Sequence, residues 1–170
     1  MGDERAEILG RLFEQHRQRL FRLARRLSGD AEEARDLVQE TFVRLARSRS
    51  LVRDGDAMER WLVRVLVNLC RDRQRRIHVR RASPASRAPV AETGEGFEDA
   101  MIARAAVQSA LAALPARRRA VVVLHEIEGR DTIEIASLLA MSRVTVRWHL
   151  HAGRKQLRAI LDPKGVRNES

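Results

Sequence analysis

Residues 131–161, DTIEIASLLAMSRVTVRWHLHAGRKQLRAIL, decide the fold of the C-terminal half of the chain. The stretch predicts a short helix, a tight turn and a longer basic helix. Ala136 is a small residue where two helices must cross closely, and Val146 and Leu150 lie one turn apart and can pack back on the first helix. Ser142 can cap the second helix, because its hydroxyl can accept a hydrogen bond from a backbone N–H in the first turn.

The second helix of this stretch carries basic and polar side chains on its remaining faces, with no acid among residues 142–158. These side chains belong to Arg143, Thr145, Arg147, Trp148, His151, Arg154, Lys155 and Arg158. The pattern is typical of a helix-turn-helix whose second helix enters a DNA major groove. An ordinary helical hairpin with a solvated basic face is the alternative that the stretch alone leaves open.

The composition of the whole chain favours helices and a polyanionic partner. The 170 residues include four Pro and nine Gly, too few for the many turns of a sandwich or barrel. A net charge of +10 attracts nucleic acid first and an acidic membrane surface second. The single cysteine, Cys70, excludes an internal disulfide and is interpreted as a small buried hydrophobe. The longest apolar run is too short to span a bilayer, so we expect a cytoplasmic protein without membrane insertion.

In the N-terminal half, apolar residues spaced by three and four predict amphipathic helices over residues 4–28 and 31–47. Asp30 is the predicted N-cap of the second helix, with Glu33 reaching back in a capping box. That helix also presents the chief acidic surface of a basic protein, formed by Glu32, Glu33, Asp36, Gln39 and Glu40. From spacing alone, a solvated face is the simpler interpretation.

A loop is predicted over residues 48–57, followed by a helix over residues 58–77 that is apolar nearly all round. Its polar positions repeat every three or four residues and form one narrow stripe, made of Arg60, Arg64, Asn68, Arg71 and Arg75. Such a helix is buried with one edge exposed. An arginine-rich edge suits phosphate contacts, whereas the helix dipole alone would explain only basic residues in the last turn.

Residues 82–99 combine small residues, Pro, Gly and acids, which is typical of a linker. Helical spacing resumes over residues 100–113 and 116–128; the valine run in the latter would also suit a strand, but Pro and Gly at its ends favour helix. We therefore expect an all-α protein of two small helical domains, residues 1–81 and 100–170, joined by a flexible acidic linker. The second domain contains the helix-turn-helix.

Three segments, in order, resemble the extracytoplasmic-function (ECF) group of bacterial RNA polymerase sigma factors. LFEQHRQRLFRLARRLSGDAEEARDLVQETFVRLAR contains the heptad DLVQETF, and MERWLVRVLVNLCRDRQRR is similar to the helix that follows it. ALAALPARRRAVVVLHEIEGRDTIEIASLLAMSRVTVRWHLHAGRKQLR resembles the C-terminal domain. The resemblance covers about residues 8–161, and it implies a factor that binds polymerase core, recognises −10 and −35 promoter elements and assists melting.

The resemblance also implies roles for individual residues. The heptad residues that would dock on the clamp of the largest polymerase subunit are Asp36, Leu37, Gln39, Glu40 and Phe42. Those that would meet −10 DNA are Arg60, Trp61, Arg64, Asn68, Arg71 and Arg75, with a pocket for unstacked bases formed by the 48–57 loop and the following helix. Those that would meet −35 DNA are Arg143, Thr145, Arg147, Trp148, His151, Arg154 and Lys155. The flap region of polymerase and an anti-sigma factor are further expected partners.

The chain departs from the usual pattern of this group at three positions. Ala140 stands in the turn where Gly is usual, Val144 replaces a frequent Gly, and Trp148 replaces a small residue. An alanine held at positive φ costs on the order of 1 kcal/mol. The indole of Trp148 is either an inward anchor or an exposed contact to sugar and thymine methyl. These changes bear on the promoter sequence recognised.

Two other classes of function fit the sequence less well. A helix-turn-helix repressor or response-regulator output protein would explain the C-terminal half but would leave the heptad and the 58–77 helix without a role. An enzyme such as a nuclease is disfavoured, because the sequence has no paired carboxylates near a His, no metal-spaced cluster and no Gly-rich phosphate loop. We therefore expect no catalytic residue, metal or cofactor.

Overall fold

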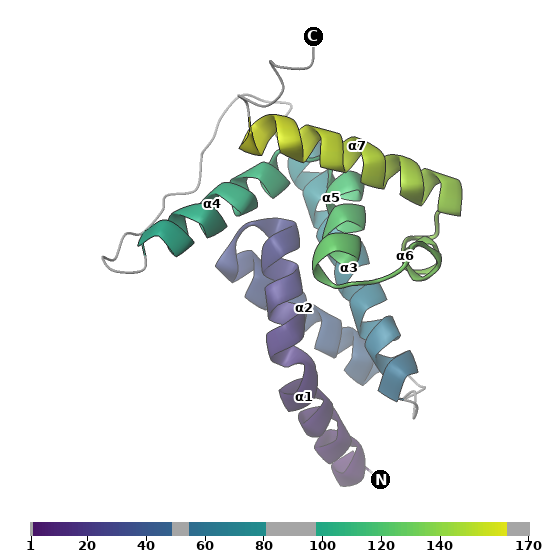
Figure 1. The fold of residues 1–170 in the computed structure, drawn as a ribbon. Coiled ribbons are helices and arrows are strands. Elements are labelled where there is room, and N and C mark those ends of the chain that lie inside the picture. Colours follow the sequence, from purple (N-terminus) through teal and green to yellow (C-terminus); the bar gives the residue numbers. More distant parts are fainter. Residues whose placement is uncertain (1, 49–54, 81–97, 163–170) are drawn as a thin grey trace. The chain divides into compact units, whose positions relative to one another are not determined.

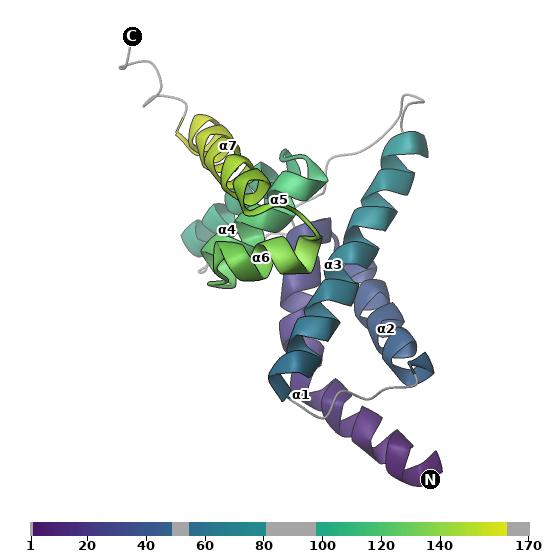
Figure 2. The ribbon, with the colours of Figure 1, turned by 90° about the vertical axis from the view of Figure 1, so that its right-hand side faces the viewer.

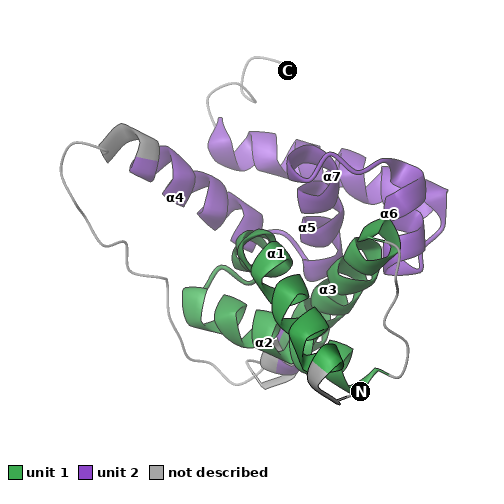
Figure 3. Ribbon diagram, turned by 90° about the horizontal axis from the view of Figure 1, so that it is seen from below, with its two compact units in different colours: residues 1–73 green, residues 74–170 purple. Residues whose placement is uncertain are grey.

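The computed structural model describes residues 2–48, 55–80 and 98–162, and every regular element within these ranges is a helix (Figures 1 and 2). The chain divides into two compact units, residues 1–73 and 74–170, and the boundary falls within α3 (Gly55–Arg80) (Figure 3). The predicted all-α class is confirmed. The predicted linker lies outside the described residues as far as residue 97, so the predicted domain bounds stay a prediction.

In the first unit, α1 (Gly2–Ser28) packs against α2 (Ala31–Arg47), whose bounds agree with the predicted helix. Gly29 joins the two helices at φ 87°, a conformation that glycine adopts without steric cost. The core between the helices is apolar and closed to solvent, and includes Leu23, Ala24, Leu27, Ala34, Leu37 and Leu45. Burial of this amphipathic face, at roughly 25 cal/mol per Å² of apolar surface, is what stabilises the pair.

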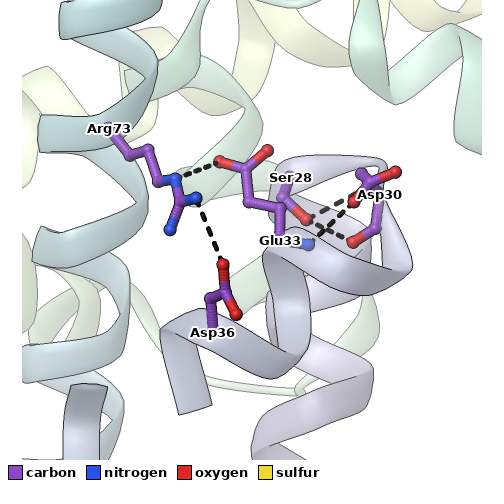
Figure 4. A network of polar contacts seen from close by, with 5 residues as sticks. All are labelled: Ser28, Asp30, Glu33, Asp36 and Arg73. Carbon is purple, nitrogen blue, oxygen red and sulfur yellow. Dashed lines mark hydrogen bonds and ion pairs between the residues drawn. The ribbon is translucent and has the colours of Figure 1, made fainter. Parts of the chain in front are cut away.

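The N-terminus of α2 is capped differently from the prediction. The carboxylate of Asp30 accepts a hydrogen bond from the Glu33 backbone N–H at 2.7 Å, as predicted. The backbone N–H of Asp30, however, donates to Oγ of Ser28 at 3.3 Å (Figure 4). The Glu33 carboxylate instead lies 3.6 Å from Nε of Arg73 on α3. The predicted reciprocal capping box is therefore wrong, because a hydroxyl two residues before the cap satisfies the donor.

The third helix, α3, begins at Gly55, so the last part of the predicted 48–57 loop is helical. Its buried side chains are Met58, Leu62, Val63, Leu66, Val67, Leu69 and Cys70. An ion pair of 2.7 Å between Arg19 on α1 and Glu59 ties the start of the helix to its neighbour. The prediction of a buried helix with one exposed edge is confirmed, and so is the interpretation of Cys70 as a small buried residue.

The second unit contains α4 (Glu98–Ala112), α5 (Ala116–Val122), α6 (Thr132–Leu139) and α7 (Arg143–Leu161). In this unit α7 packs against each of the other three helices (Figure 1). The valine run is helical as predicted, but α5 ends at Val122 and continues as a π-helical turn, η1 (Val123–Ile127). There the Glu128 backbone N–H donates to the Val123 carbonyl at 3.1 Å.

Two close contacts fix the middle of the second unit. Arg119 is only 9% exposed, and its Nη2 donates to the carbonyl oxygens of Ala112 at 2.7 Å and Leu114 at 3.2 Å, which are left without helical partners where α4 ends. Gly153 of α7 faces α5 so closely that a Cβ atom there would lie 2.5 Å from Cγ2 of Val122. A close approach of α5 and α7 thus lies at a glycine that the sequence did not single out.

Candidate functional site

The turn between α6 and α7 has the geometry that the sequence predicts. Ala140 adopts φ 50° and ψ 52°, the left-handed conformation that was expected to be costly. Oγ of Ser142 then accepts a hydrogen bond from the Thr145 backbone N–H at 3.0 Å, so α7 begins at Arg143. The α6–turn–α7 segment is therefore a helix-turn-helix with a capped second helix.

The two sides of α7 differ sharply in exposure. Val146 and Leu150 are buried, which confirms that they pack inward. The predicted −35 set faces outward: Arg143, Arg147, Trp148, His151, Arg154 and Lys155 are exposed, and Thr145 is half-buried. Trp148 is 58% exposed, so the alternative of an inward anchor is wrong and the indole lies on the outer face. The outer face thus combines positive charge with one large aromatic ring.

Arg154 does not lie free on this face. Its Nη2 is 2.6 Å from Oε1 of Glu126 in η1, and its Nε donates to the same oxygen at 2.7 Å. No acid occurs within α7 up to Arg158, so the partner comes from a neighbouring element that the sequence did not connect with α7. The ion pair lies at the surface, where it orients the guanidinium more than it stabilises the fold.

His149 follows Trp148 but has a different environment. The pKa of His149 is lowered from 6.5, first by burial of the imidazole and then by the positive charges of Arg118 and Arg117. The imidazole is therefore mostly neutral at neutral pH, although it lies on the most basic helix of the chain.

The polar stripe of α3 is exposed along one edge of a buried helix. Arg60, Arg64 and Arg75 are exposed, whereas Trp61, Asn68 and Arg71 are half-buried. Nη1 of Arg71 donates to Oδ1 of Asn68 at 3.5 Å, one helical turn away. The predicted base pocket also involves the 48–57 loop, of which residues 49–54 lie outside the described residues.

The heptad on α2 has two sides. Asp36, Gln39 and Glu40 are exposed. Leu37 is 2% exposed and belongs to the core, so it lies beneath this surface. Phe42 is half-buried, with its ring edge-on to Phe13 of α1 at 4.9 Å and 72°.

A basic residue of α3 bridges two acids of the α2 surface (Figure 4). Nη2 of Arg73 lies 3.4 Å from a carboxylate oxygen of Asp36, and its Nε lies 3.6 Å from Glu33. In the sequence Arg73 belongs to a basic run and has no evident partner. The spacing of residues along one helix predicts only contacts within that helix. It therefore could not predict the contact between residues 36 and 73, which lie on different helices.

Metal-binding clusters and membrane-spanning helices are both absent from the described ranges. Residues 2–48, 55–80 and 98–162 hold no group of three or more His, Cys, Asp or Glu side chains that could bind a metal ion. None of the helices described is long and apolar enough to cross a membrane.

The sequence matches two known families in order. Residues 12–81 match Sigma-70 region 2, and residues 104–157 match Sigma-70, region 4. The chain is 33% identical to the ECF RNA polymerase sigma factor SigL of Mycobacterium tuberculosis, over 95% of this chain and 93% of SigL. It is 41% identical to the ECF sigma factor SigE of Mycolicibacterium smegmatis, over 88% of this chain but only 60% of the length of SigE.

The fold is shared with two solved structures. The sigma factor RpoE, in complex with the anti-sigma factor NepR from Bartonella quintana, superimposes with a TM-score of 0.68 at 21% identity, covering 91% of this chain and 97% of RpoE. CnrH, in complex with the cytosolic domain of CnrY, superimposes with a TM-score of 0.66 at 26% identity, covering 94% of this chain and 90% of CnrH. The family matches, which together span both compact units, and the similarity to SigL over nearly its full length identify the family: the chain belongs to the ECF group of RNA polymerase sigma factors.

Proposed function

We propose that the chain is a promoter-specificity factor, which binds RNA polymerase core, recognises −10 and −35 promoter elements and assists melting. The proposal is carried by the matches to region 2 and region 4. The chain also presents a separate candidate surface for core binding, for the −10 element and for the −35 element. The catalytic chemistry belongs to polymerase, so the chain needs no catalytic residue. It acts where polymerase acts, in the cytoplasm.

The exposed acidic side of α2 is the proposed core-binding surface, with Asp36, Gln39 and Glu40 in contact and Leu37 and Phe42 shaping it from below. This proposal is supported by the heptad DLVQETF and by the exposure of the charged residues within it. A charged patch whose surroundings are basic gives specificity and a high association rate with a protein partner. The clamp of the largest polymerase subunit is the proposed partner.

The basic stripe of α3 is the proposed −10 surface. Arg60, Arg64 and Arg75 are exposed and suit phosphate contacts, and the half-buried Trp61 offers an aromatic face for an unstacked base. Stacking of captured bases offsets the cost of opening the duplex.

The outer face of α7 is the proposed −35 reader. Arg143, Arg147 and His151 are exposed and suit base edges, whereas Lys155 and Arg158 suit phosphates. Arg154, held by Glu126, suits a phosphate as an oriented guanidinium.

An anti-sigma factor is the proposed regulator. The resemblance to the group supports this partner, and so does the similarity to CnrH, which was solved in complex with the cytosolic domain of a second protein, CnrY. The flap region of polymerase is a further proposed contact of the second unit.

Run-off transcription with polymerase core on a randomised promoter library tests the proposal. The expected result is transcription only when both core and the chain are present, from templates that share two conserved elements at a fixed spacing. A helix-turn-helix repressor would bind DNA without core and would start no transcription. DNA binding that is independent of core, with no transcript from any template, would contradict the proposal.

A further inference from the structure

An arginine of α5 stacks on the exposed tryptophan of the proposed −35 face. The guanidinium carbon of Arg118 lies over the Trp148 ring, 5.4 Å from its centre. Because Trp148 is 58% exposed, this contact leaves much of the indole open to a ligand. A guanidinium on an indole face is attractive, and it restricts the plane in which the ring can lie.

Other contacts hold Arg118 in place. Its Nη1 donates to Oε1 of Gln156 at 2.8 Å, and Nε2 of Gln156 donates to the Ala113 carbonyl at 3.3 Å. Gly153 gives the stem of the arginine room to pass, since a Cβ atom there would lie 3.2 Å from Cγ of Arg118. The arginine is thus restrained both along its stem and at its guanidinium.

His149 restrains the indole as well. The two rings are 4.9 Å apart between centroids, at an angle of 69°. Nδ1 of His149 is buried and has no hydrogen-bond partner among the described residues, so its ring serves for packing here. A rotation of Trp148 about its side-chain bonds would break contacts with both Arg118 and His149.

We propose that Arg118 is a positioning residue, which holds the indole of Trp148 so that its open surface contacts the methyl group of one thymine in the −35 element. This rests on the proposed function, in which α7 enters the major groove. In the major groove, the C5 methyl of thymine is the apolar group on the edges of the bases. An indole ring held in a fixed orientation is complementary to this methyl group. The arginine acts through the tryptophan and does not itself touch the base.

The test uses the full chain with polymerase core on a selected promoter, in which each −35 thymine is replaced in turn by deoxyuridine. This replacement removes only the methyl group. At one of these positions, the replacement is expected to weaken binding of the unmodified chain about fourfold. This factor corresponds to the burial of one methyl-sized group. Trp148→Ala and Arg118→Ala are each expected to abolish that difference, and the double variant to add nothing further.

Arg117→Ala is the matched control, because it removes the same charge from the neighbouring exposed residue of α5. It is expected to keep the fourfold difference between thymine and deoxyuridine. Three outcomes would overturn the proposal: an unmodified chain insensitive to every methyl, an Arg118→Ala variant that keeps the difference, or one that binds all sequences more weakly with a shallower salt dependence. The last outcome would make Arg118 a phosphate contact.

A spectroscopic measurement separates failure of this inference from failure of the proposed function. The chain has two tryptophans, so Trp61→Phe leaves Trp148 as the only one. In that background Arg118→Ala is expected to weaken the near-UV circular dichroism of the indole, with far-UV dichroism unchanged. An unchanged near-UV signal would refute the positioning contact whatever the chain binds. Absence of promoter selectivity in the unmodified chain would instead refute the proposed function, and with it the thymine contact, but would leave the contact between Arg118 and Trp148 standing.

Discussion

Ala140 adopts a backbone conformation that is unfavourable for a residue with a Cβ atom. It holds φ 50° in the turn of the helix-turn-helix, where a Cβ atom is strained. The resemblance to the sigma-factor group points to this position, because Gly is usual there and alanine at positive φ is costly. The strain is tolerated because Ser142 caps α7, and Ile135, Leu138 and Leu139 of α6 are buried.

Ala140→Gly is therefore expected to stabilise the second unit by up to about 1 kcal/mol, since relief of strain outweighs the extra flexibility of an unfolded glycine. Thermal unfolding would measure the change. Ala159→Gly is the matched control, because Ala159 is exposed within α7. That variant should lose about 1 kcal/mol instead. Destabilisation by both substitutions would show that the turn is not strained.

His149 makes stability depend on pH. Because its pKa is lowered in the folded state by burial and then by Arg118 and Arg117, the unfolded chain binds its proton more readily. Stability should therefore fall as pH drops below about 6.5, and the loss should be complete below the folded pKa. Chemical unfolding between pH 7.5 and about 5 should show a shallower decline in His149→Gln than in the unmodified chain. His151→Gln, at an exposed position, should leave the decline unchanged.

Helix bounds were predicted well wherever apolar spacing and caps agree, as for α2. Three features of the elements had no such signal. The π-helical turn after Val122 depends on a change of hydrogen-bond register that leaves the apolar pattern intact. Ser28 replaced Glu33 at the α2 cap because a local hydroxyl competes with a long side chain that has a distant partner. The partners of Arg73 and Arg154 come from other helices, which spacing along one helix does not reveal.

The crossing of α5 and α7 depends on Gly153. An added methyl group would lie 2.5 Å from Cγ2 of Val122, which is itself buried, so Gly153→Ala should destabilise the second unit by about 1–3 kcal/mol. Gly10→Ala is the matched control, because nothing lies within 4 Å of the added Cβ on α1. It should stabilise the chain by about 0.5–1 kcal/mol. Equal effects at the two positions in thermal unfolding would mean that Val122 moves aside without cost.

The chain as a whole places its candidate surfaces on two compact units. The α2 heptad and most of the α3 stripe belong to residues 1–73, and the helix-turn-helix belongs to residues 74–170. The predicted site residues differ in exposure: most of the charged ones are exposed, Arg71 is half-buried, and Leu37 lies in the core. The division predicts that core binding and −35 recognition can be lost separately.

Asp36→Arg combined with Gln39→Arg should weaken binding of the full chain to polymerase core at least tenfold, since it replaces an acidic surface with a basic one. Binding of the same variant to a −35 duplex without core should stay within about twofold, because both substitutions lie on α2. Glu14→Arg with Gln18→Arg makes the same change in charge on exposed positions of α1 and should affect neither. Core affinity is measured by competition with a labelled sigma factor, and duplex affinity by anisotropy at two salt concentrations. A parallel loss of both affinities would assign the effect to overall charge or misfolding, and the α2 face would then lose its role.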